Sequence, residues 1–272
     1  MCIEIFCRTD TGRVREHNED CVGADESLCL AVLADGMGGY QAGEVASEMA
    51  ITTVIKQLNT VLKTPPRKHH YTSHNYHSAT VLLEQAVLKA NEVIYNRAEK
   101  RTDCRGMGTT LVAVLFHNDF ISVAHVGDSR LYRLRGNTFC QMTKDHSVRQ
   151  ELVDCGYYTP EQARHSPNKN LVTRALGVGK KVTVDIQEYK LLAQDIYLLC
   201  SDGLNDMLED CDMRTILNNA NSFEEAAELL INAANEKGGN DNTSLILVRP
   251  SQRFIQKQQK VWWRRLFDFF ST

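Results

Sequence analysis

The chain has 272 residues, of which 43% are hydrophobic and 24% charged, a composition typical of globular proteins that excludes a disordered chain. Lys and Arg number 31 and Asp and Glu 34, so the formal charge of −3 argues against nucleic acid as a partner. The sequence contains nine cysteines but no C-x-x-C pair, which favours reduced thiols. It also shows no apolar run of membrane-spanning length and no signal peptide, so we expect a cytoplasmic protein.

The first hundred residues predict two strands followed by two helices. The strands are expected at residues 2–9 and 28–34, the second being a compact apolar run. Apolar residues at helical spacing predict helices at 41–62 and 79–101. Two prolines after residue 64 end the first of these helices, because proline removes a hydrogen-bond donor and clashes with the preceding turn.

The remaining residues predict strands in sequence, a polar irregular stretch at 144–180, and a final mixed part. The predicted strands lie at 110–116, 120–126, 130–134, 139–142, 182–189, 196–200 and 244–248, with helices at 211–218 and 222–236. Such an order does not alternate strand and helix, so it favours an α+β fold of stacked antiparallel sheets covered by helices. We expect one domain over residues 1–250 and a tail over 251–272.

An aspartate accompanies a glycine at one end of four apolar strands. Asp35, Asp128 and Asp202 follow strands, and Asp241 precedes the last one. If these ends meet, the carboxylates would repel one another unless cations lay between them. Oxygen ligands suit Mg²⁺ or Mn²⁺ better than Zn²⁺. Single Asp-Gly dipeptides are also common in turns, and for Gly127-Asp128 a simple hairpin is the favoured interpretation.

Taken in order, these segments resemble the metal-dependent protein phosphatases, the PPM or type-2C serine/threonine family, in their bacterial form. The resemblance covers about residues 8–248. It rests on TDTGRVREHNED (9–20), ADGMGG (34–39) with AGEVAS (42–47), GMGTT (106–110), VGDSR (126–130), TKDHS (143–147), LVTRALG (171–177), SDGL (201–204) and NDNTS (240–244). It implies a four-layer α-β-β-α sandwich, with two central antiparallel sheets flanked by helix pairs.

The resemblance also implies a set of metal ligands. Asp35 would bridge two ions of Mn²⁺ or Mg²⁺, and Gly36 would contribute its backbone carbonyl. Asp202 and Asp241 would complete the shell of the first ion. Asp128 matches the position of a third, weaker metal site in bacterial relatives.

The other implied roles concern the substrate and the waters around the metals. Arg15 would bind the substrate phosphate, a task suited to the fork of donors on a guanidinium. Glu19, Asp20 and Glu44 would hold metal-bound waters. Arg15, Asp20 and Asp35 are therefore the expected catalytic residues of a reaction in which metal-activated water attacks phosphorus.

The sequence departs from the family at the expected general acid. Met37 and Tyr40 stand where some relatives have histidine, so the acid would be a metal-bound water or His165. His165 lies on the loop 153–170, which corresponds to a mobile flap in the family. His146 also matches a family position, although an isolated loop histidine is more often structural than catalytic.

Two features lie outside the motifs. Four histidines at 69–77 could bind a transition metal, but a solvated loop between helices is the favoured interpretation. The tail at 252–272 has a net charge of +4 and contains both tryptophans. It could lie on an anionic membrane, fill a partner's groove, or pack as a helix on its own domain.

The leading hypothesis is a monomeric phosphatase that removes phosphate from phosphoserine and phosphothreonine in proteins and so reverses a cognate kinase. It would use two or three Mn²⁺ or Mg²⁺ ions per site. The alternative is a catalytically silent pseudophosphatase that only binds phosphoproteins, although each matched metal position still carries Asp or Gly. A third hypothesis is a regulatory phosphatase for one dedicated partner that docks through the tail.

Overall fold

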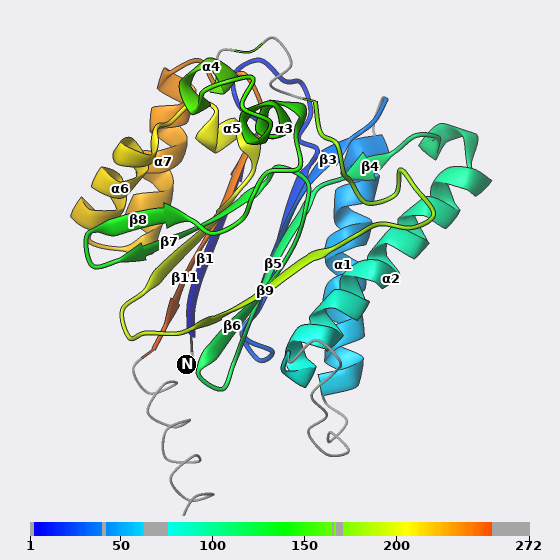
Figure 1. The fold of residues 1–272 in the computed structure, drawn as a ribbon, viewed down its shortest axis with the longest axis horizontal. Helices are drawn as coiled ribbons and strands as arrows, with labels where there is room; N and C mark the ends of the chain where they lie inside the picture. The colour runs from blue at the N-terminus through cyan, green and yellow to red at the C-terminus, as the bar shows by residue number, and fades with distance from the viewer. Residues whose placement is uncertain (1–2, 40–41, 63–75, 165, 167–170, 252–272) are drawn as a thin grey trace, which may run out of the picture.

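The computed structural model describes residues 3–39, 42–62, 76–164, 166 and 171–251 (Figure 1). The expectations for Tyr40, for His165, for the histidines at 69, 70 and 74, and for the tail from residue 252 concern residues outside this described part. Within the described ranges, none of the helices combines the length and the apolar character that crossing a bilayer requires.

Two antiparallel sheets form the centre of the molecule (Figure 1). The first has the order β1-β11-β10-β7-β8, with bounds Ile3–Asp10, Thr243–Pro250, Ile196–Cys200, Arg130–Arg135 and Thr138–Gln141. The second has the order β2-β3-β5-β6-β9, with bounds Asp20–Asp25, Leu30–Met37, Leu111–His117, Phe120–Val126 and Asp185–Lys190. A short strand β4, Gly108–Thr109, pairs with the end of β3.

Helices cover the outer face of each sheet. The long helices α1 (Ala42–Leu62) and α2 (Ser78–Lys100) pack on the second sheet, and α5 (Asp202–Asn205), α6 (Asp210–Asn219) and α7 (Phe223–Glu236) pack on the first (Figure 1). The short helices α3 (Val148–Asp154) and α4 (Pro160–Arg164) lie in the stretch between β8 and β9. The expected α+β sandwich of four layers is therefore confirmed.

Burial on both faces explains why the central strands are continuous apolar runs. Alternate residues of a strand point to opposite faces. In β3, Leu30 and Val32 belong to the core beneath the helices, whereas Ala31 and Leu33 belong to the core between the sheets. All four side chains are buried completely. A strand in this position needs no polar face, so its sequence does not alternate.

Three local expectations differ from the structure. Strand β2 was not predicted, because its sequence DCVGAD lacks an apolar alternation. The hairpin at Gly127-Asp128 is wrong, because β6 and β7 belong to different sheets and these residues cross from one sheet to the other. Ser222 followed by Glu225 predicts a reciprocal capping box at the start of α7. Ser222 Oγ does accept from Glu225 N at 3.1 Å, but the Glu225 carboxylate accepts from Asn221 N and not from Ser222 N.

The core between the sheets should carry much of the stability. We expect Leu33→Ala to lower the free energy of unfolding by about 2–5 kcal/mol, because it leaves a cavity among side chains that cannot collapse. Urea denaturation measures this loss. The matched control is Leu88→Ala on the outer side of α2, where 40% of Leu88 is exposed; there we expect a change within about 0.5 kcal/mol. Equal losses at both positions would contradict this account of the core.

Candidate active site

Five aspartates from distant parts of the chain meet at one end of the two sheets. Asp20 and Asp35 are direct partners across the β2–β3 pair. Asp128 lies in the crossing between β6 and β7, Asp202 opens α5, and Asp241 precedes β11. Burial first, and then the negative charges of the other four, raise the pKa of Asp35 well above its usual value. Asp35 therefore lies within electrostatic reach of the other four aspartates, and Asp35, Asp128, Asp202 and Asp241 are the four expected metal ligands.

The same crowding raises the pKa values of the neighbouring carboxyls. Burial raises the pKa of Asp20 to about 7, although its Oδ2 accepts a hydrogen bond from Ser201 Oγ at 2.8 Å. Burial and the charge of Asp145 raise the pKa of Asp128 to about 6. The pKa of Asp202 is raised well above its usual value by burial and then by the charge of Asp128. Positive charge brought into this cluster would displace protons and stabilise the carboxylates.

The donor atoms of the cluster fit a hard divalent cation. Glu19 Oε1, Asp20 Oδ1 and Asp128 Oδ2 are buried oxygens without a hydrogen-bond partner among the described residues. Buried acceptors of this kind are costly unless a cation or water satisfies them. The aspartates of the cluster offer only oxygen, the ligand type of Mg²⁺ and Mn²⁺. The donor type and the unpartnered oxygens of these residues therefore fit the expected metals.

Two glycines let the start of α1 press against the end of β3. A Cβ atom on Gly36 would lie 2.2 Å from Gly43 O and 2.6 Å from Glu19 O. A Cβ atom on Gly43 would lie 2.6 Å from the Glu19 carboxyl carbon. Gly36 N donates to Glu19 O at 3.1 Å, and so does Ser47 Oγ, at 2.6 Å. This packing fixes Glu19 beside the cluster and leaves no room for side chains.

Glu44 lies near this contact but is exposed in the first turn of α1. Its charge is among those that raise the pKa of Glu19, for which burial is the largest cause. Met37 ends β3 opposite Gly108 of β4. The structure therefore places Glu44 at the rim of the site. Met37, which stands where some relatives have histidine, lies at the end of a strand.

Arg15 reaches the cluster from the solvent side. Its Nη2 donates to Asp241 Oδ2 at 2.8 Å, while half of the side chain remains exposed. A guanidinium has five N–H donors, so several remain for an incoming ligand. The position suits the binding of an anion that arrives from solvent, as expected for a substrate phosphate.

Asn242 organises this part of the site, a role that sequence reasoning missed. Its Nδ2 donates to the backbone oxygens of Thr11 and His17, each at 2.9 Å, and its Oδ1 accepts from Glu19 N at 2.8 Å. One amide therefore holds both ends of the loop that carries Arg15. The signal in the sequence was its place in the NDNTS motif, which was assigned only for its aspartate.

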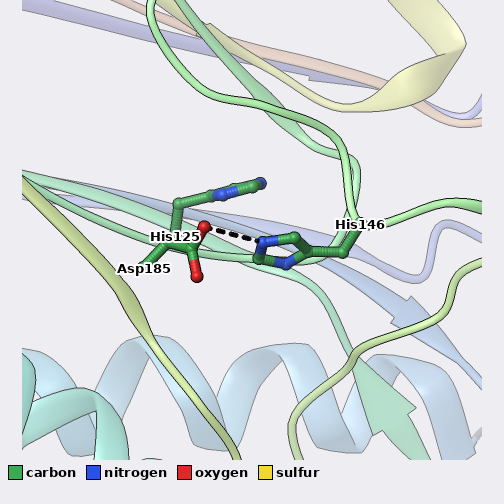
Figure 2. A group of neighbouring side chains, drawn as sticks. All are labelled: His125, His146 and Asp185. Carbon is green, nitrogen blue, oxygen red and sulfur yellow. Dashed lines mark ion pairs between the residues drawn. The ribbon is translucent and has the colours of Figure 1, made fainter. Parts of the chain in front are cut away.

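His146 lies beside His125 and Asp185 (Figure 2), and it braces the turn that carries Asp128. Its backbone N donates to Gly127 O at 2.8 Å, and Gly127 N donates to His146 Nδ1 at 3.0 Å. The ring proton must then lie on Nε2, which is 3.2 Å from Asp185 Oδ2. The ring of His125 lies 4.4 Å away, centroid to centroid. His146 thus acts structurally, through the backbone of the crossing between the sheets.

The ligating atoms of His125, His146 and Asp185 lie within 4.8 Å of one another, which is close enough to consider a metal site. Three contacts argue against that interpretation. Nδ1 of His146 is occupied by the Gly127 amide, and Arg174 Nη1 lies 3.0 Å from Nε2 and 2.6 Å from Asp185 Oδ1. A guanidinium in this position already supplies the positive charge that a metal would bring.

Comparison with known proteins places this architecture in a family. Residues 12–245 match the family described as Protein phosphatase 2C. Over 246 residues the chain is 40% identical to the serine/threonine phosphatase stp of Listeria welshimeri, covering 89% of this chain and 93% of the relative. Over 249 residues it is 39% identical to the serine/threonine protein phosphatase PstP of Mycobacterium tuberculosis, covering 91% of this chain and 45% of that longer protein.

Solved structures agree with the sequence comparison. The crystal structure of M. tuberculosis PstP/Ppp matches with a TM-score of 0.82 and 36% identity, covering 93% of this chain and 100% of that one. The PstP catalytic domain in complex with two manganese ions matches with a TM-score of 0.79 and 36% identity, covering 92% and 99%. The chain therefore belongs to the protein phosphatase 2C family, as its ordered motifs and its two-sheet architecture both indicate.

Proposed function

We propose that this chain is a metal-dependent serine/threonine protein phosphatase that hydrolyses phosphoserine and phosphothreonine in proteins. The observation that carries the proposal is the gathering of five aspartates at one end of the sheets, one of which, Asp241, pairs with the half-exposed guanidinium of Arg15. Relatives that are 34–40% identical over nine tenths of the chain carry serine/threonine or protein phosphatase names, which supports the same activity here.

The metal ligands of the proposal are the expected ones. Asp35 and the backbone carbonyl of Gly36 would hold two divalent ions together with Asp202 and Asp241, and Asp128 would border a third, weaker site. Bound ions of this class act as Lewis acids and make water nucleophilic at neutral pH. The manganese complex of the PstP domain supports Mn²⁺ as one ion that this donor set accepts, and Mg²⁺ shares its preference for oxygen.

The protein's own groups have separate tasks. Arg15 would bind two phosphate oxygens through its fork of donors and stabilise the charge that develops on them. Asp20 is anchored by Ser201 through Oδ2, so its unpartnered Oδ1 is placed to hold a water or accept a proton. Glu19, fixed between α1 and β3, and Glu44 at the rim would orient further waters.

Loss of one proposed ligand distinguishes an enzyme from a silent phosphoprotein-binding module. We expect Mn²⁺-dependent hydrolysis of p-nitrophenyl phosphate and of a phosphothreonine peptide, abolished by EDTA. Asp202→Ala should lower kcat/KM at least about 100-fold. Even residues that only hydrogen-bond to metal ligands commonly contribute about 10–100-fold to metal affinity or activity. The control is Asp103→Ala, an exposed aspartate paired with Arg101, which should leave the rate unchanged. Phosphopeptide binding without turnover in any divalent ion would favour the pseudophosphatase.

Metal binding should release protons, because the raised pKa values keep protons on the cluster near neutrality. A carboxyl must lose its proton to bind a metal, so Mn²⁺ affinity should rise from pH 5.5 to pH 7.5. Titration calorimetry at pH 6.5, in two buffers of different ionisation enthalpy, should report release of about one proton or more. Affinity that does not change over this pH range would contradict the proposed ligand set.

Partners and organisation follow from the same proposal. We propose a monomer with one phosphatase domain over residues 1–250, phosphoprotein substrates and a cognate serine/threonine kinase whose action it reverses. A phosphatase dedicated to one partner docked through residues 251–272 is the narrower form of this proposal. We place the protein in the cytoplasm, with the basic aromatic tail as a peripheral contact to a membrane or to that partner. The support for the tail's role is its composition alone.

A shortened chain tests the tail. If residues 252–272 bind an anionic surface, the full chain should float with vesicles containing phosphatidylserine, and a chain ending at Pro250 should not. Binding should weaken as salt rises, because the attraction is electrostatic. Hydrolysis of p-nitrophenyl phosphate by both chains shows that the domain is intact. Equal flotation of the two chains would exclude the membrane contact and leave docking to a partner or to the domain itself.

A further inference from the structure

A second guanidinium near the aspartate cluster, that of Arg149, is buried. Arg149 of α3 is only 7% exposed, in contrast to Arg15. Its Nη1 donates to Asp206 Oδ1 at 2.8 Å, and its Nη2 lies 3.3 Å from Asp145 Oδ2. Buried charges persist only when they are paired, and breaking such a pair leaves the remaining charge uncompensated. The partners of Arg149 therefore decide what this residue does.

Asp145 already has a cation of its own. Arg130 Nε and Nη2 donate to its two carboxylate oxygens at 2.9 and 2.7 Å, and Gln141 Nε2 adds a bond of 2.8 Å. The pKa of Asp145 is accordingly lowered despite its burial. Because Arg130 forms the bidentate pair, the charge of Arg149 is available for Asp206.

Asp206 belongs to the same structural unit as a proposed metal ligand. It caps the C-terminal end of α5, four residues after Asp202, and its N donates to Asp202 O at 2.8 Å. Residues four apart in a helical turn lie on the same side. The negative charge of Asp206 raises the pKa values of both Asp202 and Asp128, while the positive charge of Arg149 lowers that of Asp128. Arg149 and Asp206 therefore bring opposite charges to Asp128, and their ion pair of 2.8 Å adjoins the helical turn that begins with Asp202.

We propose that Arg149 is a built-in counter-cation that pairs with Asp206, keeps this carboxylate from a divalent ion beside Asp128, and thereby weakens the third metal site. The pair also fastens α3 to α5, which lie at the same end of the molecule (Figure 1). Arg149 is a positioning residue and touches no substrate. The inference rests on the proposed function, because Asp128 must border a metal site for it to hold.

Mn²⁺ binding by the full-length protein tests the inference without measuring activity. The protein is stripped of metal and titrated with Mn²⁺, by calorimetry and by the electron paramagnetic resonance signal of free Mn²⁺. We expect Arg149→Met, which keeps an unbranched apolar stem and removes the charge, to tighten the weakest Mn²⁺ site about tenfold. Arg149→Lys keeps the charge and should stay within about threefold of the wild type. The matched control Arg249→Met removes an exposed arginine paired with Glu4 and should change nothing.

The double variant Arg149→Met with Asp206→Asn identifies the route. Its weakest site should return to the affinity of the wild type, because the gain requires the carboxylate of Asp206. A double variant as tight as Arg149→Met, or an Arg149→Met isotherm equal to that of the wild type, would overturn the inference.

A single substitution keeps the inference testable if Arg149→Met does not fold. Asp206→Asn leaves Arg149 with less compensation beside Asp128, so the weakest Mn²⁺ site should weaken about threefold to tenfold. Unchanged or tighter binding would overturn the inference. A wild-type chain that binds no Mn²⁺ would overturn the proposed function and this inference together, whereas a wild type that binds Mn²⁺ and hydrolyses phosphopeptides leaves the proposed function intact.

Discussion

Repulsion among closely placed carboxylates is the constraint on which the rest of this structure depends. Five aspartates come from separate segments: Asp20, Asp35, Asp128, Asp202 and Asp241. Burial and nearby negative charges raise the pKa values of the first four. A chain holds such groups together only if the energy of the surrounding fold exceeds their repulsion. Here the fold provides this energy through three apolar cores, one between the sheets and one beneath the helices on each side. The divalent ions of the proposed function would remove the repulsion itself.

The segments that carry the aspartates are held by polar contacts, since apolar packing alone does not fix a loop. Ser201 Oγ donates to Asp20 and also accepts from Ser244 N at 2.9 Å, so it links β10, β11 and β2. Asn242 holds the loop before β2, and His146 holds the crossing that carries Asp128. Such supporting contacts orient metal ligands and fix their geometry before the ligand binds. They explain how loops and strand ends can present a rigid site.

Two arginines flank the cluster, and their burial separates their roles. Arg15 is half exposed and makes one contact to Asp241, which leaves donors for a phosphate that enters from solvent. Arg149 is buried and its donors are directed to Asp206 and Asp145, so no incoming anion competes for it. On the proposed function, Arg15 would bind the substrate, and Arg149 would adjust the charge near the metal ions. The two arginines would have different roles because their exposure to water differs.

The sequence by itself determined the apolar strands and helices, the aspartates at strand ends, and the ordered motifs that place the chain in its family. These features are local, because an apolar run such as 28–34, or the glycine after Asp35, can be recognised from a few neighbouring residues. Only the tertiary structure decided that Gly127-Asp128 crosses between sheets, that β2 pairs Asp20 with Asp35, and that Asn242 and Arg149 hold neighbours far away in the chain. Strand pairing and ion pairs join residues that are far apart in the sequence. The periodicity of apolar residues along the chain therefore cannot predict them.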